Sequence, residues 1–565
     1  MDIVLGLFFV VIAACLGGLL AKKLKLPSLV GYISLGILVG VLLPPSLREV
    51  TSLAQVGIIL LLFSVGVELS LDRLSKYLKV AVLGSIIQVV LVTVLFFLIL
   101  SVLGFGTLPS LVLAIGFSVS STAVLVKILG DRGETDTIHG EIMLGWSLVQ
   151  DLIIIPVMVI LPVLSANSSN GIFVPVIASL GKAVLVIVGT LILGKVIFPF
   201  FIHKLASTNS RELLLLSSIA MALGTAAITS FFGISPALGA FLAGVVISGS
   251  QENHAIFAET RPLRDLFVAL FFVTLGFLVI PSVIISKFGI IILLTILVLL
   301  VKNIVVFAVS SIFGYKGKTA VATSFGLSQV GEFAFVIFSA ALTLGILTKE
   351  QTSIGIAVTL LTLVISPILY NFVVPFWRKM RSVTSGIPFL SKLFSAGERA
   401  EVGNTKFENH IIICGYGRVG KWIGKAFTDF NIPFVVVEYN QKIVQELKNN
   451  GTPVLYGDPT EPEVLEAVNI RNSKAVILAI PDRVAQETLI AYTQSVAPEV
   501  KIISRVHLDE DWEKLKVLRV NKIVQPEFEA AIEIVRSVLR SMGKDKIEIS
   551  GSIKSLRASH AQNRS

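Results

Sequence analysis

The feature that most constrains this chain is a series of long apolar segments, which fills most of residues 3–376. A segment of about 20 apolar residues can cross the hydrocarbon core of a bilayer as a helix. Only 15% of the 565 residues are charged, whereas ordinary soluble domains carry about 25%. The sequence therefore predicts a polytopic α-helical membrane protein rather than a soluble one.

The lengths of these segments predict about thirteen membrane spans. Lys and Arg residues cluster in alternate connections between spans, and such connections face the cytoplasm. An odd number of spans then puts the N-terminus outside a cell membrane and everything after residue 376 in the cytoplasm. Because the net charge of +10 lies mainly in these connections, it does not indicate nucleic-acid binding. The expected spans are 3–21, 28–43, 53–70, 78–104, 107–129, 141–164, 173–202, 213–231, 236–250, 263–280, 284–313, 319–346 and 350–376.

Two of the expected spans are polar at mid-membrane depth: 107–129 contains GFSVSSTAV and 319–346 contains FGLSQVGEFAF. Backbone groups freed at that depth are tolerated only where protein or a water-filled cavity satisfies them. Interrupted spans at matching places in two halves are typical of inverted-repeat transporters, although hydroxyls in the first span could serve helix packing alone. We expect two broken helices. The candidate ion-site residues there are Ser118, Ser120, Ser121, Thr122, Gln329 and Glu332.

Gln150 and Asp151 lie in the middle of the span at 141–164. An ionisable group at that depth is costly and usually faces a cavity or a partner. Desolvation favours the protonated carboxyl, whereas a bound cation favours the carboxylate. Competition between a proton and a monovalent cation for Asp151 would produce antiport; a purely structural carboxylate is the alternative. Lys302, inside a later span, could pair with Asp151 or Glu332, or extend outward to the membrane surface.

From Asn409 onward, short apolar runs alternate with amphipathic stretches of helix length. This alternation predicts a doubly wound, Rossmann-type parallel sheet. The runs lie at 410–417, 434–440, 453–458, 475–480, 501–506 and 522–526.

The first of these runs leads into GYGRVG, and Glu438 ends the next. Glycines in such a turn let backbone amides approach a phosphate, and the acid can bind ribose hydroxyls. Because an acid there disfavours a 2′-phosphate, we expect NAD(H) or an adenine nucleotide such as AMP, ADP or ATP. A degenerate turn without ligand is the alternative. The candidate nucleotide-binding residues are Gly415, Tyr416, Gly417, Arg418, Val419, Gly420 and Glu438.

Seven stretches carry a family resemblance: LPSLVGYISLGILVG, LLFSVGVEL, SVSSTAVLVKIL, LVQDLIIIP, ALGAFLAGVVIS, RDLFVALFFVTLGF and LSQVGEFAFVIF. In these stretches, which occur in the family's order and together cover most of residues 20–376, the chain resembles the monovalent cation:proton antiporter-2 family. It is most similar to the Kef-type potassium/proton antiporters with an attached TrkA-N (KTN/RCK) domain.

The resemblance implies an inverted-repeat fold with two crossing broken helices and a dimerisation domain, hence a homodimer. It makes Gln150–Asp151 the ion-site dipeptide, and the Gln-Asp form is associated with electroneutral potassium exchange. Lys302 resembles a lysine that recurs at this place in the superfamily. Asp458 matches a position near the adenosine. Arg505, like Arg418, matches an arginine that holds glutathione in some members but could equally contact nucleotide phosphate, so glutathione gating stays open.

These observations predict a monovalent cation/proton antiporter, most simply K⁺/H⁺, with the cation at Asp151 and regulation by a nucleotide. A Na⁺/H⁺ antiporter and a nucleotide-gated, channel-like potassium efflux protein are the alternatives. A membrane-tethered oxidoreductase is disfavoured, because no substrate domain adjoins the glycine-rich turn, so we expect neither enzymatic activity nor a catalytic cofactor. The expected parts are a membrane domain at 1–376, a linker at 377–403, the TrkA-N domain at 404–541 and a polar, basic tail without regular structure at 542–565.

Overall fold

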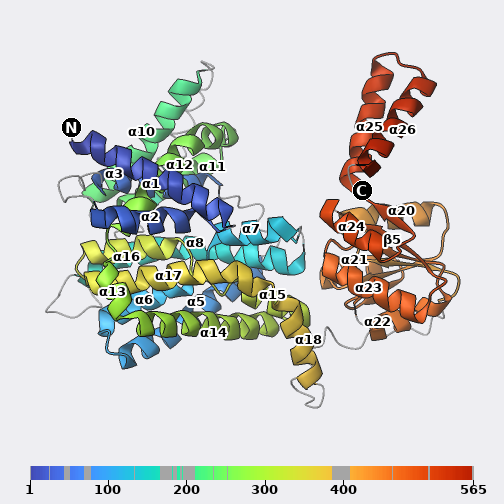
Figure 1. The fold of residues 1–565 in the computed structure, drawn as a ribbon, viewed down its shortest axis with the longest axis horizontal. Helices are drawn as coiled ribbons and strands as arrows, with labels where there is room; N and C mark the ends of the chain where they lie inside the picture. Colours follow the sequence, from blue (N-terminus) through green and yellow to red (C-terminus); the bar gives the residue numbers. More distant parts are fainter. Residues whose placement is uncertain are drawn as a thin grey trace. The chain divides into compact units, whose positions relative to one another are not determined.

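The computed structural model divides the chain into two units (Figure 1). The first comprises Met1–Val126, Ile142–Tyr315 and Ala320–Val374, and the second comprises Lys127–Glu141, Lys316–Thr319 and Pro375–Ser565. Apart from isolated residues between 181 and 194, the structure describes residues 2–24, 26–42, 51–68, 78–132, 134–135, 137–165, 210–232, 235–250, 252–384, 407–460, 462–506 and 509–562.

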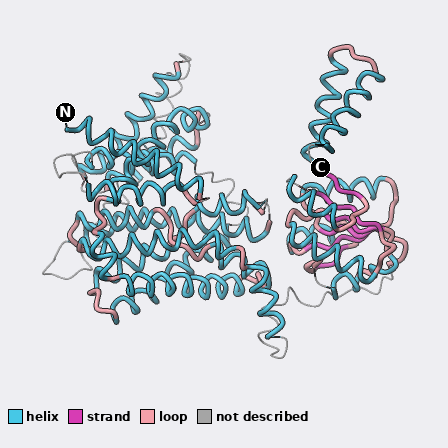
Figure 2. The backbone as a smooth tube through the Cα atoms, viewed as in Figure 1, coloured by secondary structure: helices cyan, strands magenta, loops and turns pink. Residues whose placement is uncertain are grey.

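The described part of the chain up to residue 384 is built from helices (Figure 2). Their bounds agree with the expected spans to within a few residues at most ends. The helices are α1 (Asp2–Lys23), α2 (Ser28–Leu42), α3 (Thr51–Glu68), α5 (Leu78–Val102), α6 (Thr107–Ser118), α7 (Thr122–Arg132), α8 (Ile138–Ser165), α10 (Arg211–Phe231), α11 (Pro236–Ser248), α12 (Asn253–Gly276), α13 (Pro281–Ser286), α14 (Phe288–Ile312), α15 (Gly317–Gly326), α16 (Phe333–Thr343), α17 (Lys349–Tyr370) and α18 (Val373–Thr384).

Among the described residues, 7 helical segments are long and apolar enough to cross a membrane, and shorter apolar helices accompany them. Helix α5 exposes Leu83, Val90 and Leu98, as expected of a helix that faces lipid. The predicted span at 173–202 lies almost wholly outside the described residues, so the count of about thirteen spans stays a prediction.

Helices α3 and α11 approach each other at a pair of glycines. A Cβ atom at Gly66 would lie 2.4 Å from the carbonyl oxygen of Phe241, and one at Gly244 would lie 2.2 Å from that of Phe63. Only hydrogen fits at either position, and small residues are what allow helix backbones to approach this closely in membranes. The pair therefore fixes the distance between the two helices.

We expect Gly244→Val to push α3 and α11 apart and to lower the melting temperature of the purified protein by roughly 5 °C, because overpacking a close helix contact is destabilising. Gly224→Val on α10 is the matched control, since a Cβ atom there meets nothing within 4 Å. Fluorescence-detected thermal unfolding in detergent measures both, and equal shifts would contradict the close contact.

The second unit contains a parallel sheet of 6 strands in the order β3-β2-β1-β4-β5-β6, which confirms the doubly wound prediction. Its strands and the helices between and after them are β1 (Ile411–Cys414), α20 (Arg418–Asp429), β2 (Phe434–Glu438), α21 (Gln441–Asn449), β3 (Val454–Tyr456), α22 (Pro462–Ala467), β4 (Ala475–Leu478), α23 (Arg483–Val496), β5 (Lys501–Arg505), α24 (Asp509–Val517), β6 (Lys522–Val524), α25 (Pro526–Ser541) and α26 (Lys546–Gln562).

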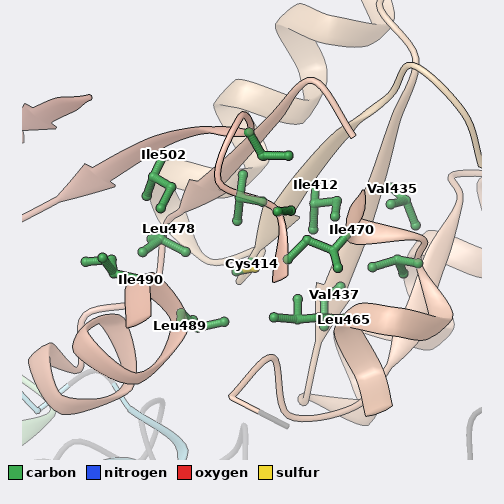
Figure 3. Close-up of a cluster of buried hydrophobic side chains, with 14 of the residues drawn as sticks. Ile412, Cys414, Val435, Val437, Leu465, Ile470, Leu478, Leu489, Ile490 and Ile502 are labelled. Carbon is green, nitrogen blue, oxygen red and sulfur yellow. The ribbon is translucent and has the colours of Figure 1, made fainter. Parts of the chain in front are cut away.

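Side chains alternate between the two faces of this sheet. Ile412 and Cys414 of β1 join the core on one face, with Val435 of β2 and Leu478 of β4 (Figure 3). Ile413 belongs to the core on the opposite face. Burial raises the pKa of the Cys414 thiol, so this cysteine stays protonated and serves packing.

The C-terminal segment differs from its predicted lack of structure, because residues 546–562 form α26. Asp545 caps this helix by accepting a hydrogen bond from the Glu548 amide at 2.7 Å. Ile549 and Ile553 then pack on Ile532 of α25. The prediction rested on the polar composition of this segment and overlooked Ile549 and Ile553. Their spacing of four residues places them on one face of a helix.

Candidate functional site

Both predicted interruptions occur as breaks between helices. The first span divides into α6, which ends at Ser118, and α7, which begins at Thr122; Val119 between them is extended, with φ −80° and ψ 155°. The second divides into α15, which ends at Gly326, and α16, which begins at Phe333. We call residues 119–121 the first break and residues 327–332 the second break.

The two breaks contact each other directly. The Gly331 amide donates to the Val119 carbonyl at 3.1 Å, and the Ser120 hydroxyl donates to the Leu327 carbonyl at 2.9 Å. A Cβ atom at Gly331 would lie only 2.8 Å from the Ser120 carbonyl, so glycine is required there. Gln329 Nε2 also donates to the Ser121 carbonyl at 3.2 Å. Each break thus supplies hydrogen-bond donors to backbone carbonyls of the other, which a continuous helix would have paired internally.

Lys302 of α14 binds both breaks. Its fully buried ammonium donates to the carbonyls of Val119 at 2.7 Å and Gln329 at 2.6 Å, and to the Ser120 hydroxyl at 3.0 Å. The sequence suggested a carboxylate partner or an outward orientation, whereas in the described part of the chain the ammonium points inward to two carbonyls and a hydroxyl. The reason is electrostatic: α6 and α15 end here, and the C-terminal end of a helix carries partial negative charge.

Asp151, in the middle of α8, lies beside the N-terminal end of α7, whereas Lys302 lies beside the C-terminal ends of α6 and α15. Its Oδ2 accepts a hydrogen bond from the Thr122 hydroxyl at 2.8 Å, and Thr122 is the first residue of α7. The side chain is buried, with 7% of its surface exposed. The N-terminal end of a helix carries partial positive charge, so this position favours an anion without requiring a basic side chain.

Glu332 directly precedes α16. In the first break, Ser121 caps α7 by accepting from the Val124 amide at 3.3 Å. Among the described residues, two buried acceptor oxygens of the second break, Gln329 Oε1 and Glu332 Oε2, have no hydrogen-bond partner. The breaks therefore bring together hydroxyls, carboxylates and unpaired acceptor oxygens.

Gln150 is fully buried beside Asp151, and its amide is engaged at both ends. Its Oε1 accepts from the Ser120 amide at 2.7 Å, while its Nε2 donates to Gln88 Oε1 on α5 at 2.5 Å. Gln88 was not among the residues predicted for the site. The signal was available, because Gln88 is a lone amide side chain in the long apolar segment that forms α5.

In the second unit, Gly415, Glu438, Asp458 and Arg505 all lie at the carboxyl ends of strands, where doubly wound folds bind ligands. Gly415 has a φ of +91°, and a Cβ atom at Gly420 would lie 2.2 Å from the Gly415 carbonyl oxygen. The turn therefore needs both glycines to bring α20 this close to β1.

Glu438 holds the glycine-rich turn in place. Its Oε2 accepts from the Tyr416 amide at 2.6 Å and its Oε1 from the Asn440 amide at 2.8 Å. Asp458 closes a turn by accepting from the Thr460 amide at 2.8 Å. The remaining predicted ligand residues begin α20 or end β5: Gly417 and Arg418 are exposed, and Val419 and Arg505 are half-buried.

A membrane unit with two broken helices in contact, followed by a Rossmann-type sheet, defines a transporter with an attached α/β domain. The family model for the transmembrane sodium/hydrogen exchangers matches residues 10–374, and the model for the TrkA-N domain matches residues 411–526. The chain belongs to the sodium/hydrogen exchanger family. It is therefore a multi-pass membrane transporter and not an enzyme.

Two relatives agree with this assignment, and one solved structure is similar in fold. The Escherichia coli protein named "Putative cation/proton antiporter YbaL" is 30% identical over 524 residues, which cover 91% of this chain and 93% of that protein. A glutathione-regulated potassium-efflux system protein of Haemophilus influenzae is 28% identical, covering 95% of this chain and 86% of that one. The sodium proton antiporter MjNhaP1 of Methanocaldococcus jannaschii covers 70% of this chain and all of its own at 19% identity, with a TM-score of 0.53.

We expect Lys302→Met to lower the melting temperature by roughly 5–10 °C, because it leaves buried carbonyls unpaired and the negative helix ends uncompensated. Asn303→Ala on the same helix is the control, because Asn303 Nδ2 donates to the Leu299 carbonyl, at 2.8 Å, within α14 itself. Thermal unfolding of the purified variants measures both. A shift for Lys302→Met no larger than the control's would show that the lysine does not stabilise the breaks.

Proposed function

We propose that this chain is a secondary antiporter that exchanges a monovalent cation, potassium in the first instance, for protons, and that the two compete for Asp151. The observation that carries the proposal is the placement of Asp151: a buried carboxylate at the positive end of α7, bonded to the Thr122 hydroxyl at 2.8 Å. Potassium is favoured by the Gln150–Asp151 pair and by the name of the H. influenzae relative.

The second break also supports a cation site. Gln329 Oε1 and Glu332 Oε2 are buried acceptor oxygens there, Gln329 contacts the Ser121 carbonyl next to Thr122, and oxygen is the donor that hard cations prefer. We place Ser118, Ser120, Ser121 and Thr122 in the same site as the residues that shape it. Lys302 then stabilises the breaks and takes no cation itself.

The finer architecture belongs to the same proposal. We infer about thirteen spans arranged as an inverted repeat, with the N-terminus outside and the TrkA-N domain in the cytoplasm. The proposed parts keep the boundaries 1–376, 377–403, 404–541 and 542–565, and the functional form is a homodimer. The pattern of basic connections and the two broken helices support this arrangement.

We expect Asp151→Asn to reduce potassium-driven proton movement at least tenfold, because the amide cannot exchange a proton for a cation. In the wild type, the apparent KM for potassium should rise as the pH falls, because protons then compete for the carboxylate. Proteoliposomes containing a pH-sensitive dye measure both, with K⁺, Na⁺, Rb⁺ and Li⁺ added in turn.

Glu141→Gln is the control for this experiment, since Glu141 lies in the first turn of the same helix α8. It should leave exchange within about twofold of the wild type. Full exchange by Asp151→Asn would remove Asp151 from the mechanism. Cation flux whose reversal potential ignores pH would instead indicate a channel.

We further propose that the glycine-rich turn binds NAD(H) or an adenine nucleotide such as AMP, ADP or ATP, which regulates exchange. Gly417 supplies an amide at the start of α20, and Tyr416, whose own amide is held by Glu438, shapes the turn beside it. Glu438 faces the ribose, and Asp458, Arg418 and Arg505 complete the site at the strand ends. Regulation requires the ligand to bind two transport states unequally. Glutathione is a second possible ligand of the two arginines.

We expect NADH or AMP at about 100 times its Kd to stabilise the wild type by about 2.7 kcal/mol, seen as a rise in melting temperature. Glu438→Ala should abolish that rise, because the turn loses the carboxylate that orients its amides. Glu446→Ala on the neighbouring helix α21, an exposed residue, should keep it. A ligand-induced rise that survives Glu438→Ala would place the nucleotide elsewhere.

A further inference from the structure

The first break leaves backbone groups whose hydrogen bonds come from side chains of several helices. In a continuous helix, the Ser118 carbonyl and the Ser120 amide would pair with backbone groups four residues away. Here Gln88 Nε2 donates to the Ser118 carbonyl at 3.0 Å, and Gln150 Oε1 accepts from the Ser120 amide at 2.7 Å. The two glutamines are joined to each other at 2.5 Å.

We propose that Gln88 is a positioning residue of the ion site. With Gln150 it forms an uncharged bridge of two amide side chains across the break between α6 and α7. This bridge holds Thr122, the first residue of α7, against Asp151. This inference rests on the proposed exchange at Asp151. Gln88 itself lies on α5 and contacts the break through the Ser118 carbonyl.

The orientation of both amides is fixed by the backbone. The Ser120 amide can only donate, so Gln150 must present its oxygen to it and its NH₂ group to Gln88. Gln88 must then present its oxygen to Gln150, which leaves its NH₂ group for the Ser118 carbonyl, a group that can only accept. Gln88 and Gln150 are both fully buried, so each unmade hydrogen bond here would be costly.

The bridge also requires both side chains to be uncharged. A carboxylate at position 88 would face the Ser118 carbonyl with an oxygen, and two acceptors repel each other. Only the protonated acid could replace the amide, because its hydroxyl donates to Ser118 while its carbonyl accepts from Gln150. Gln88→Glu therefore converts the bridge into a titratable one.

The test compares full-length Gln88→Glu, Gln88→Leu and Ser85→Ala with the wild type in proteoliposomes, using potassium-driven proton movement across pH. Ser85 is the matched control: it is fully buried on the same helix, and its one hydroxyl proton is donated to the Trp146 carbonyl of α8 at 3.2 Å rather than to a glutamine. It should stay within about twofold of the wild type.

Gln88→Leu should raise the apparent KM for potassium about tenfold, because the break loses the bond that aligns Thr122 with Asp151. Gln88→Glu should exchange like the wild type at low pH. It should lose activity faster than the wild type as the acid ionises, over roughly pH 6–9, the range in which buried glutamates titrate. An unchanged KM in Gln88→Leu, or a wild-type pH profile in Gln88→Glu, would overturn the proposal.

Thermal unfolding of the same proteins separates this inference from the proposed function. The melting temperature of Gln88→Glu should match that of the wild type at low pH and fall below it as pH rises, because the folded state disfavours the ionised side chain. If the wild type moves no protons with any cation, the proposed exchange fails. A Gln88→Glu melting profile parallel to the wild type's would then overturn the bridge independently.

Discussion

The structure of the membrane unit depends on satisfying the backbone groups that two helix breaks expose inside a bilayer. Water is not available there, so each freed carbonyl needs a donor from the protein. The carbonyls of Ser118, Val119 and Ser121 receive donors from Gln88, Lys302 and Gln329, which lie on α5, on α14 and in the second break. Segments far apart in the sequence are therefore held together by the breaks themselves.

Much of this arrangement could be predicted from the sequence. The polar runs at 116–124 and 325–335 indicated both breaks, because clustered polar residues are costly in an apolar segment unless the fold gives them partners. The alternation of apolar runs after Asn409 likewise indicated the parallel sheet, and strand β1 does lead into the glycine-rich turn. These are local patterns, which periodicity and composition record directly.

Partnerships between distant residues could not be predicted in this way. Lys302 was expected to meet a carboxylate or the membrane surface, because a buried lysine usually pairs with an opposite charge or extends to the interface. Its actual partners are carbonyls of two helix ends that become neighbours only in the fold. Gln88 was overlooked for the same reason, since its role depends on Gln150, 62 residues away.

The partners of Lys302 and Asp151 determine how a carboxylate in this setting can change its protonation state. An ammonium beside Asp151 would favour the ionised form strongly and oppose proton uptake. A hydroxyl has no such preference, because Thr122 can donate to the carboxylate or accept from the protonated acid. With Lys302 directed to the helix ends and Thr122 at 2.8 Å from Asp151, the carboxyl retains a hydrogen-bond partner in both states. Under the exchange proposed at Asp151, a hydrogen-bond partner that suits both states lets the carboxyl take up either a proton or a cation.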